Sequence, residues 1–143
     1  MKITPTTEDR FWAVLSHLSA LAFGLGILLP IIGWSEQRNK SKYASFQCLQ
    51  ALGYQSLGYT VWILFYLVMV ILFMVVFIFA IRAAGNDSTI ITTWISILLF
   101  VIFGLFGIYL LFPVIAALAC ALGREFRYPI MGNRLASYLG YEA

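Results

Sequence analysis

The chain has 143 residues, of which 62% are hydrophobic and only 10% are charged, with a formal net charge of +3. A soluble domain usually carries about 25% charged residues, so this composition excludes an ordinary water-soluble protein. The basic residues stand at the ends of apolar segments, as membrane topology requires. No soluble basic face is left to hold phosphates, and we therefore expect no nucleic-acid partner.

The first apolar segment predicts a transmembrane helix over residues 11–34. A threonine before two acidic residues predicts its N-cap: Thr6 or Thr7, then Glu8 and Asp9. Three residues inside the segment predict a kink or a close backbone contact: Gly24, Gly26 and Pro30. A break into two short helices is the alternative, and neither half alone would be long enough to cross a membrane.

The next apolar stretch is too long for a simple span. Residues 43–81 would form a helix of about 58 Å, against a hydrocarbon core of about 30 Å. Its first third is the more polar part, which predicts an interfacial amphipathic lead-in over 43–53. A second span is then expected over 55–81.

Gly, Asn, Asp and Ser cluster over residues 82–88 and predict a turn. A third span is expected over 90–122, ended by Gly123, and a polar C-tail over 124–143 with one short helix around 133–139. The sequence therefore predicts an all-α integral membrane protein of one domain, residues 1–143, with three transmembrane helices. Counts of Lys and Arg then place the C-terminus in the cytoplasm and the N-terminus outside, whereas a hairpin-like first segment would place both inside.

His17 is the sharpest candidate for a functional side chain, because an ionisable residue within an apolar span is expensive. One interpretation is a hydrogen bond across helices to Gln50 or Gln55. The other is ligation of haem, a pigment or a metal, although no second histidine is present to complete a two-histidine haem site. We expect the hydrogen bond and no cofactor or metal.

Two further clusters are candidates for binding. The first is a polar face within the membrane that would turn towards another helix, water or headgroups: Gln47, Gln50, Tyr54 and Gln55. The second is a docking surface for anionic lipid or a partner: Arg124, Glu125, Arg127 and Tyr128. No catalytic motif or paired carboxylate is present in the sequence, so we expect no enzyme activity.

Three blocks of the sequence resemble the bacterial Tic-twenty-like membrane proteins. They are D-R-F-W-A-V-L-S-H-L-S-A-L over residues 9–21, F-Q-C-L-Q-A-L-G-Y-Q over 46–55 and R-E-F-R-Y-P-I over 124–130. The resemblance covers roughly residues 8–135 and implies a small helical protein of the bacterial inner membrane. Distant relatives belong to the chloroplast inner-envelope import machinery, and others, such as MamF, belong to magnetosome membranes.

Three functions are compatible with these features. The first is a non-catalytic accessory or assembly subunit of a larger membrane complex, possibly bioenergetic or photosynthetic, with lipids and other membrane subunits or further copies as partners. The second, by family analogy, is a component of a translocation machinery or channel. The third is a pigment- or haem-binding subunit that uses His17.

Overall fold

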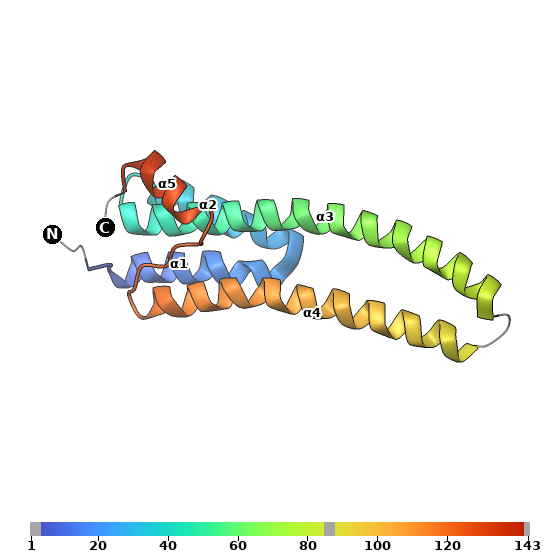
Figure 1. Ribbon diagram of the computed structural model, residues 1–143. Coiled ribbons are helices and arrows are strands. Elements are labelled where there is room, and N and C mark those ends of the chain that lie inside the picture. Colours follow the sequence, from blue (N-terminus) through green and yellow to red (C-terminus); the bar gives the residue numbers. More distant parts are fainter. Residues whose placement is uncertain (1–3, 85–87, 142–143) are drawn as a thin grey trace. The chain divides into compact units, whose positions relative to one another are not determined.

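The computed structural model describes residues 4–84 and 88–141, apart from the side chains of Phe23, Ala80, Ala83, Ala84 and Ser88, and all its regular elements are helices (Figure 1). The chain divides into two compact units, one of Met1–Gly58 with Leu110–Ala143 and one of Tyr59–Tyr109. The first, called unit 1 below, contains every candidate site residue.

Unit 1 begins with three short helical elements: α1 over Thr7–Leu18, the 3-10 helix η1 over Ser19–Ile27 and α2 over Leu28–Gln37. Thr6 caps α1, because its hydroxyl accepts a hydrogen bond from the Asp9 amide while the Asp9 carboxylate accepts one from the Thr6 amide. The expected cap is therefore confirmed at Thr6.

Helices α1 and α2 form an antiparallel hairpin (Figure 1). At its open end, Gln37 Nε2 donates to Glu8 Oε1 over 3.0 Å. At its closed end, a Cβ atom on Gly26 would lie 1.8 Å from the carbonyl oxygen of Ser19, so only glycine permits this approach. The prediction of one continuous span over 11–34 is therefore wrong, and the break into two short helices is what the structure contains.

Helix α3 covers Lys42–Ala84 in 43 residues without a break, so the expected lead-in over 43–53 is its first part. Helix α4 covers Ser88–Ala121 and corresponds to the expected span over 90–122. Within the described residues, these are the two helices long and apolar enough to cross a membrane, where three were predicted. The expected turn lies largely outside the described residues, since 85–87 are not among them.

Gly123 ends α4, as the sequence predicted. Its φ of 70° is left-handed, and its amide donates to the Cys120 carbonyl over 2.9 Å. The Arg124 amide donates to the Ala119 carbonyl, also over 2.9 Å. This pair of hydrogen bonds is the Schellman motif, which satisfies the last carbonyls of a helix.

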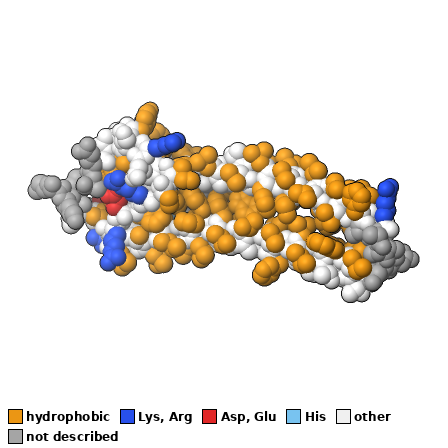
Figure 2. Space-filling view, viewed as in Figure 1, with side chains coloured by type: hydrophobic (Ala, Val, Ile, Leu, Met, Phe, Trp, Pro, Cys, Tyr) orange, Lys and Arg blue, Asp and Glu red, His pale blue; other side chains and the backbone are white. Residues whose placement is uncertain are grey.

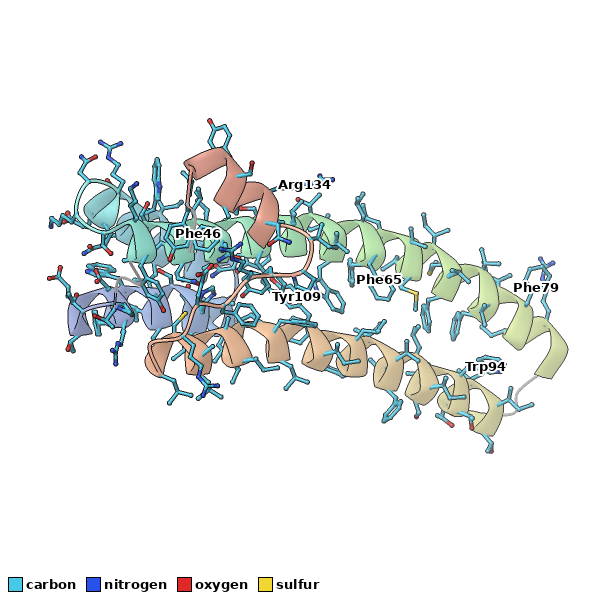
Figure 3. The ribbon with its side chains drawn as sticks, turned by 60° about the vertical axis from the view of Figure 1, so that its left-hand side comes forward. Phe46, Phe65, Phe79, Trp94, Tyr109 and Arg134 are labelled. Atoms are coloured by element: carbon cyan, nitrogen blue, oxygen red, sulfur yellow. The ribbon has the colours of Figure 1, made fainter. Side chains whose placement is uncertain are left out.

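The C-terminal tail leaves α4 as an irregular segment over 124–128 and then forms α5 over Gly132–Leu139, close to the expected short helix. The Tyr141 ring stacks on Phe46 of α3, with ring centroids 4.5 Å apart. Figure 3 labels Phe46 on α3. The C-terminal tail therefore packs against α3.

Small side chains dominate the core of unit 1. Its central cluster contains Ala13, Tyr43 and Cys120, with Phe126 packed against it. Further buried alanines and a second free, buried cysteine lie on α3 and α4: Ala44, Cys48, Ala51, Ala116 and Ala117. Small residues allow helix backbones to approach closely, which is the usual basis of helix packing in membranes.

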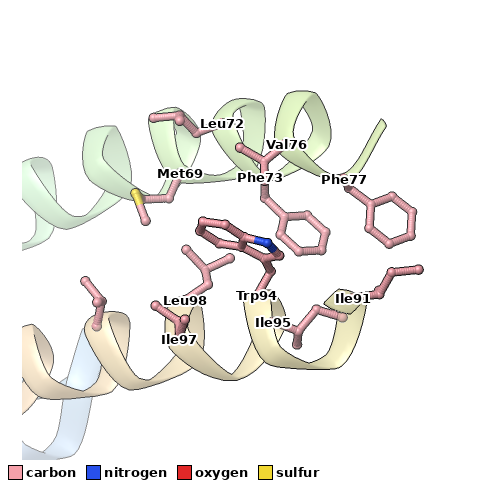
Figure 4. Close-up of a pocket in the computed structure, with 11 residues that line it drawn as sticks. Met69, Leu72, Phe73, Val76, Phe77, Ile91, Trp94, Ile95, Ile97 and Leu98 are labelled. Carbon is pink, nitrogen blue, oxygen red and sulfur yellow. The ribbon is translucent and has the colours of Figure 1, made fainter. Parts of the chain in front are cut away.

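The second unit consists of the distal parts of α3 and α4. Trp62 on α3 meets Phe106 on α4 edge to face, with ring centroids 5.4 Å apart. A mainly apolar, partly open pocket of about 180 Å³ lies further along, lined by residues that include Met69, Phe73 and Trp94 (Figure 4). Most large apolar side chains of these helices point outward and remain exposed (Figure 2), as lipid contact allows.

Candidate functional site

His17 is fully buried in unit 1, and both of its ring nitrogens have side-chain partners. Nε2 lies 3.1 Å from Oε1 of Gln47 on α3. Nδ1 lies 3.2 Å from the hydroxyl oxygen of Tyr128 in the tail. One imidazole therefore connects α1, α3 and the tail.

The neighbours of His17 determine which nitrogen carries the proton. Gln47 Nε2 donates to the Phe126 carbonyl over 3.1 Å, which turns its Oε1 towards the imidazole. That oxygen can only accept, so His17 Nε2 donates to it, and Nδ1 of the neutral ring accepts from Tyr128. Burial lowers the pKa of His17 from 6.5 to about 4, against a smaller opposing effect of Gln47, so the ring is neutral at pH 7.

Gln50 holds the backbone of the tail. Its Nε2 donates to the Phe126 carbonyl over 2.9 Å, and its Oε1 accepts from the Tyr128 amide over 3.0 Å. The Gln50 side-chain amide thus satisfies backbone groups of this irregular, part-buried segment that no helix or strand would pair. We refer to His17, Gln47, Gln50 and Tyr128 together as the polar cluster.

Aromatic rings surround the polar cluster. Tyr54 stacks on Tyr128, with centroids 4.4 Å apart and planes at 11°. Phe126 meets the His17 ring edge to face, with centroids 6.4 Å apart. These rings shield the polar hydrogen bonds from solvent, which strengthens each of them and makes an unpaired partner costly.

Gln55 has a different role from the other glutamines. Its Nε2 donates to the Ser16 carbonyl over 3.1 Å and to Ser19 Oγ over 3.0 Å, where α1 passes into η1. Ser19 Oγ in turn donates to the Ser16 carbonyl over 2.7 Å. Gln55 therefore ties α3 to the hairpin rather than to the tail.

The second expected cluster divides between the interior and the surface. Tyr128 is buried and belongs to the polar cluster. Arg127 pairs with Glu125, and its guanidinium also lies 5.9 Å from the centre of the Phe46 ring. Arg124 contributes its carbonyl, which accepts from the Tyr43 hydroxyl over 3.0 Å. Arg127 and Glu125 keep part of their side chains exposed.

The sequence identified most members of the polar cluster but not their pairing. The hydrogen bond expected from His17 to Gln50 or Gln55 instead goes to Gln47, and Tyr128 was assigned to a different cluster. The Phe126 carbonyl and the hairpin serines were missed. One signal for the tail was available: Pro129 disfavours a helix at Tyr128, so the backbone there needs side-chain partners.

The hydrogen bonds of this arrangement hold α1, α3 and the tail together. Among the described residues, no group of three His, Cys, Asp or Glu is placed to bind a metal ion. A haem or pigment ligand at His17 would have to displace Gln47 or Tyr128 from a ring nitrogen. The polar side chains at this site bind the backbone and side chains of their own unit.

Two helices long and apolar enough to cross a membrane, joined to a small helical unit, indicate a small helical membrane protein. The family model of the magnetosome magnetite crystal formation proteins, MamF and MmsF, matches residues 8–135. The chain therefore belongs to this family of bacterial magnetosome membrane proteins. No curated protein and no solved structure gave a significant match. The family includes the MamF relative named from the sequence, while the Tic-twenty-like assignment is not confirmed.

Proposed function

We propose that the protein is a non-catalytic accessory or assembly subunit of the magnetosome membrane that contributes to the formation of the magnetite crystal. The observation that carries this proposal is the polar cluster, whose hydrogen bonds end on the protein's own tail. Gln47 and Gln50 donate to the Phe126 carbonyl, and His17 Nδ1 accepts from the Tyr128 hydroxyl. The family match supports the magnetosome as the location, in place of the bioenergetic or photosynthetic complex suggested by the sequence.

The surface supports a role in contacts with lipid and other subunits. Large apolar side chains along α3 and α4 are exposed, among them Val61, Tyr66, Phe79, Phe100 and Phe103. In a bilayer such side chains face acyl chains or pack against neighbouring helices, including those of further copies. The hydrogen bonds on both nitrogens of His17 favour a structural role over ligation, which an optical spectrum of the purified protein tests.

The hairpin changes the proposed orientation. The start of α1, the loop from α2 to α3 and the tail meet at one end of unit 1, because Gln37 contacts Glu8 and Tyr43 contacts Arg124. These segments carry most of the described basic residues: Arg10, Arg38, Lys40, Lys42, Arg124, Arg127 and Arg134. Arg82 is the one at the other end of α3. Because cytoplasmic segments carry the excess of Lys and Arg, we propose that both termini lie in the cytoplasm.

Deletion and complementation in a magnetosome-forming bacterium test the function. We expect the deletion strain to form crystals of altered size or number in electron micrographs, and the wild-type chain to restore them. Affinity purification of the full chain in mild detergent should also recover further copies or other magnetosome membrane proteins. Unchanged crystals, or a monodisperse monomer with no partner, would contradict the proposal.

A further inference from the structure

We infer that the hairpin of α1, η1 and α2 enters one leaflet of the membrane with its η1 tip and returns to the side from which it came. The occupant of its exposed apolar face is the acyl-chain layer of that leaflet. The inference rests on the proposed location in a membrane and adds how the first third of the chain meets the lipid.

Charge is confined to the two ends of the hairpin. Glu8, Asp9 and Arg10 stand at the start of α1, and Glu36 and Arg38 stand at the end of α2. No side chain from 11 to 35 carries a charge at pH 7, since His17 is buried and neutral. Charged groups stay at the membrane surface while apolar segments enter the core. This charge distribution therefore favours a hairpin whose open end lies at the headgroups and whose tip lies among the acyl chains.

The tip carries apolar side chains that are exposed to a large extent in the described part of unit 1. The exposed fraction is 49% for Leu21, 77% for Leu25 and 53% for Leu28. Ile31 and Ile32 continue the exposed apolar face along α2 at helical spacing. Apolar area of this extent is unfavourable in water and favourable among acyl chains.

The arms are too short to cross. Helix α1 has 12 residues and α2 has 10, which correspond to about 18 Å and 15 Å at 1.5 Å per residue. A hydrocarbon core of about 30 Å is roughly twice as thick as either arm is long. Because Ser19 and Gly26 touch, the chain turns back at the tip rather than continuing.

The backbone at the tip forms internal hydrogen bonds, as an apolar environment requires. In lipid, every amide and carbonyl must find a partner within the protein. The 3-10 pattern of η1 supplies hydrogen bonds between residues three apart over Ser19–Ile27. Leu28 continues this pattern by donating to the Leu25 carbonyl, and Pro30 in the first turn of α2 has no amide hydrogen to satisfy.

Single cysteines in the full chain, reconstituted into sealed vesicles, test the path of the hairpin. Thr7→Cys and Lys40→Cys report its two ends, Leu25→Cys its tip and Arg82→Cys the far end of α3. The native Cys48 and Cys120 are both buried, so the wild-type chain gives the labelling background. Where this background is high, Cys48→Ala and Cys120→Ala are added, with gel filtration to confirm the fold.

We expect a membrane-impermeant maleimide to label Thr7→Cys and Lys40→Cys from the same side and Arg82→Cys from the other. Leu25→Cys should resist the reagent from both sides, and a bimane on it should be quenched by spin-labelled lipids more than a bimane at Lys40. Labelling of Thr7→Cys and Lys40→Cys from opposite sides would show a crossing segment. Ready labelling of Leu25→Cys in water would show a surface hairpin. Either result overturns the inference.

Failure of the proposed membrane location would look different. In that case alkaline carbonate would extract the protein from the vesicles, and all four positions would be labelled from the aqueous side. If the protein resists carbonate extraction but Leu25→Cys is labelled by the aqueous reagent, the proposed membrane location stands and only the insertion of the hairpin is contradicted.

Discussion

His17 Nε2 donates to Oε1 of Gln47 over 3.1 Å, and the direction of this hydrogen bond is imposed by a third residue. The Phe126 carbonyl accepts a hydrogen bond from Gln47 Nε2, so the glutamine presents its oxygen to the imidazole ring. A carbonyl in the tail thereby selects the tautomer of a histidine on α1. The hydrogen bonds of the polar cluster are consequently cooperative, because the direction of each one depends on its neighbours.

Replacing His17 by alanine should destabilise the protein strongly. The change removes the donor to the buried Gln47 Oε1, at about 1–3 kcal/mol for an unsatisfied group, and it opens a cavity beside Tyr128. The melting temperature in detergent should fall, whereas Tyr138→Ala, at a residue 85% exposed, should leave it nearly unchanged. Equal melting temperatures for the two variants would show that the cluster contributes little.

Acid should destabilise the protein through His17. The folded pKa of about 4 lies below the unfolded value of 6.5, so the unfolded chain binds the proton more tightly. The stability contribution is complete above pH 6.5 and falls as the pH drops towards 4, by about 3 kcal/mol in total. Melting temperatures measured across this range should show the loss.

The variant His17→Gln provides the control for the acid effect. Its glutamine side chain does not titrate, so its melting temperature should change less with pH than that of the wild type. A pH dependence of equal size in both proteins would show that His17 is not its source.

Gly26→Ala should disrupt the hairpin, because the new methyl group would meet the Ser19 carbonyl oxygen at 1.8 Å and backbone must move to accept it. We expect a loss of more than about 2 kcal/mol. Gly24→Ala is the matched control, since a Cβ atom there meets nothing within 4 Å. Chemical denaturation in detergent micelles should separate the two variants, and equal stability would mean that η1 does not close as described.

Gln50→Ala should release the tail. The Phe126 carbonyl and the Tyr128 amide both lose a partner, so the segment over 124–128 should open more often. Trypsin should then cleave after Arg124 or Arg127 faster than in the wild type. Gln55→Ala alters the same helix by the same substitution but removes contacts to the hairpin, so its tail should be cleaved at the wild-type rate.

The sequence predicted those parts of the fold that depend on local chemistry. The cap at Thr6 and the end of α4 at Gly123 follow from side-chain hydrogen bonding and from a left-handed backbone, and both are present. Helix α4 was likewise expected from its apolar length, and the short helix in the tail lies close to the expected residues 133–139. These signals act within a few residues, which is why one sequence is enough to see them.

The hairpin and the pairing within the polar cluster were not predictable in the same way. Residues 11–34 are long and apolar enough to span. Contacts between distant residues, Gly26 with Ser19 and Gln37 with Glu8, show that they turn back. His17 and Tyr128 are 111 positions apart, and no periodicity relates them. Such contacts are set by how the helices pack. The sequence therefore predicted Gln50 or Gln55 as the hydrogen-bond partner of His17, whereas the partner is Gln47.

The inserted hairpin should give the protein a preference for curved membranes. It adds α1 and α2 to the leaflet on the side of the termini, and each helix is about 10 Å wide, so that leaflet expands. Reconstituted protein should therefore be denser per lipid in small vesicles than in large ones. Leu25→Asp opposes insertion, at a cost of up to about 2.5–3.5 kcal/mol, and should reduce this preference. A density independent of vesicle size in the wild type would show that the hairpin does not expand one leaflet.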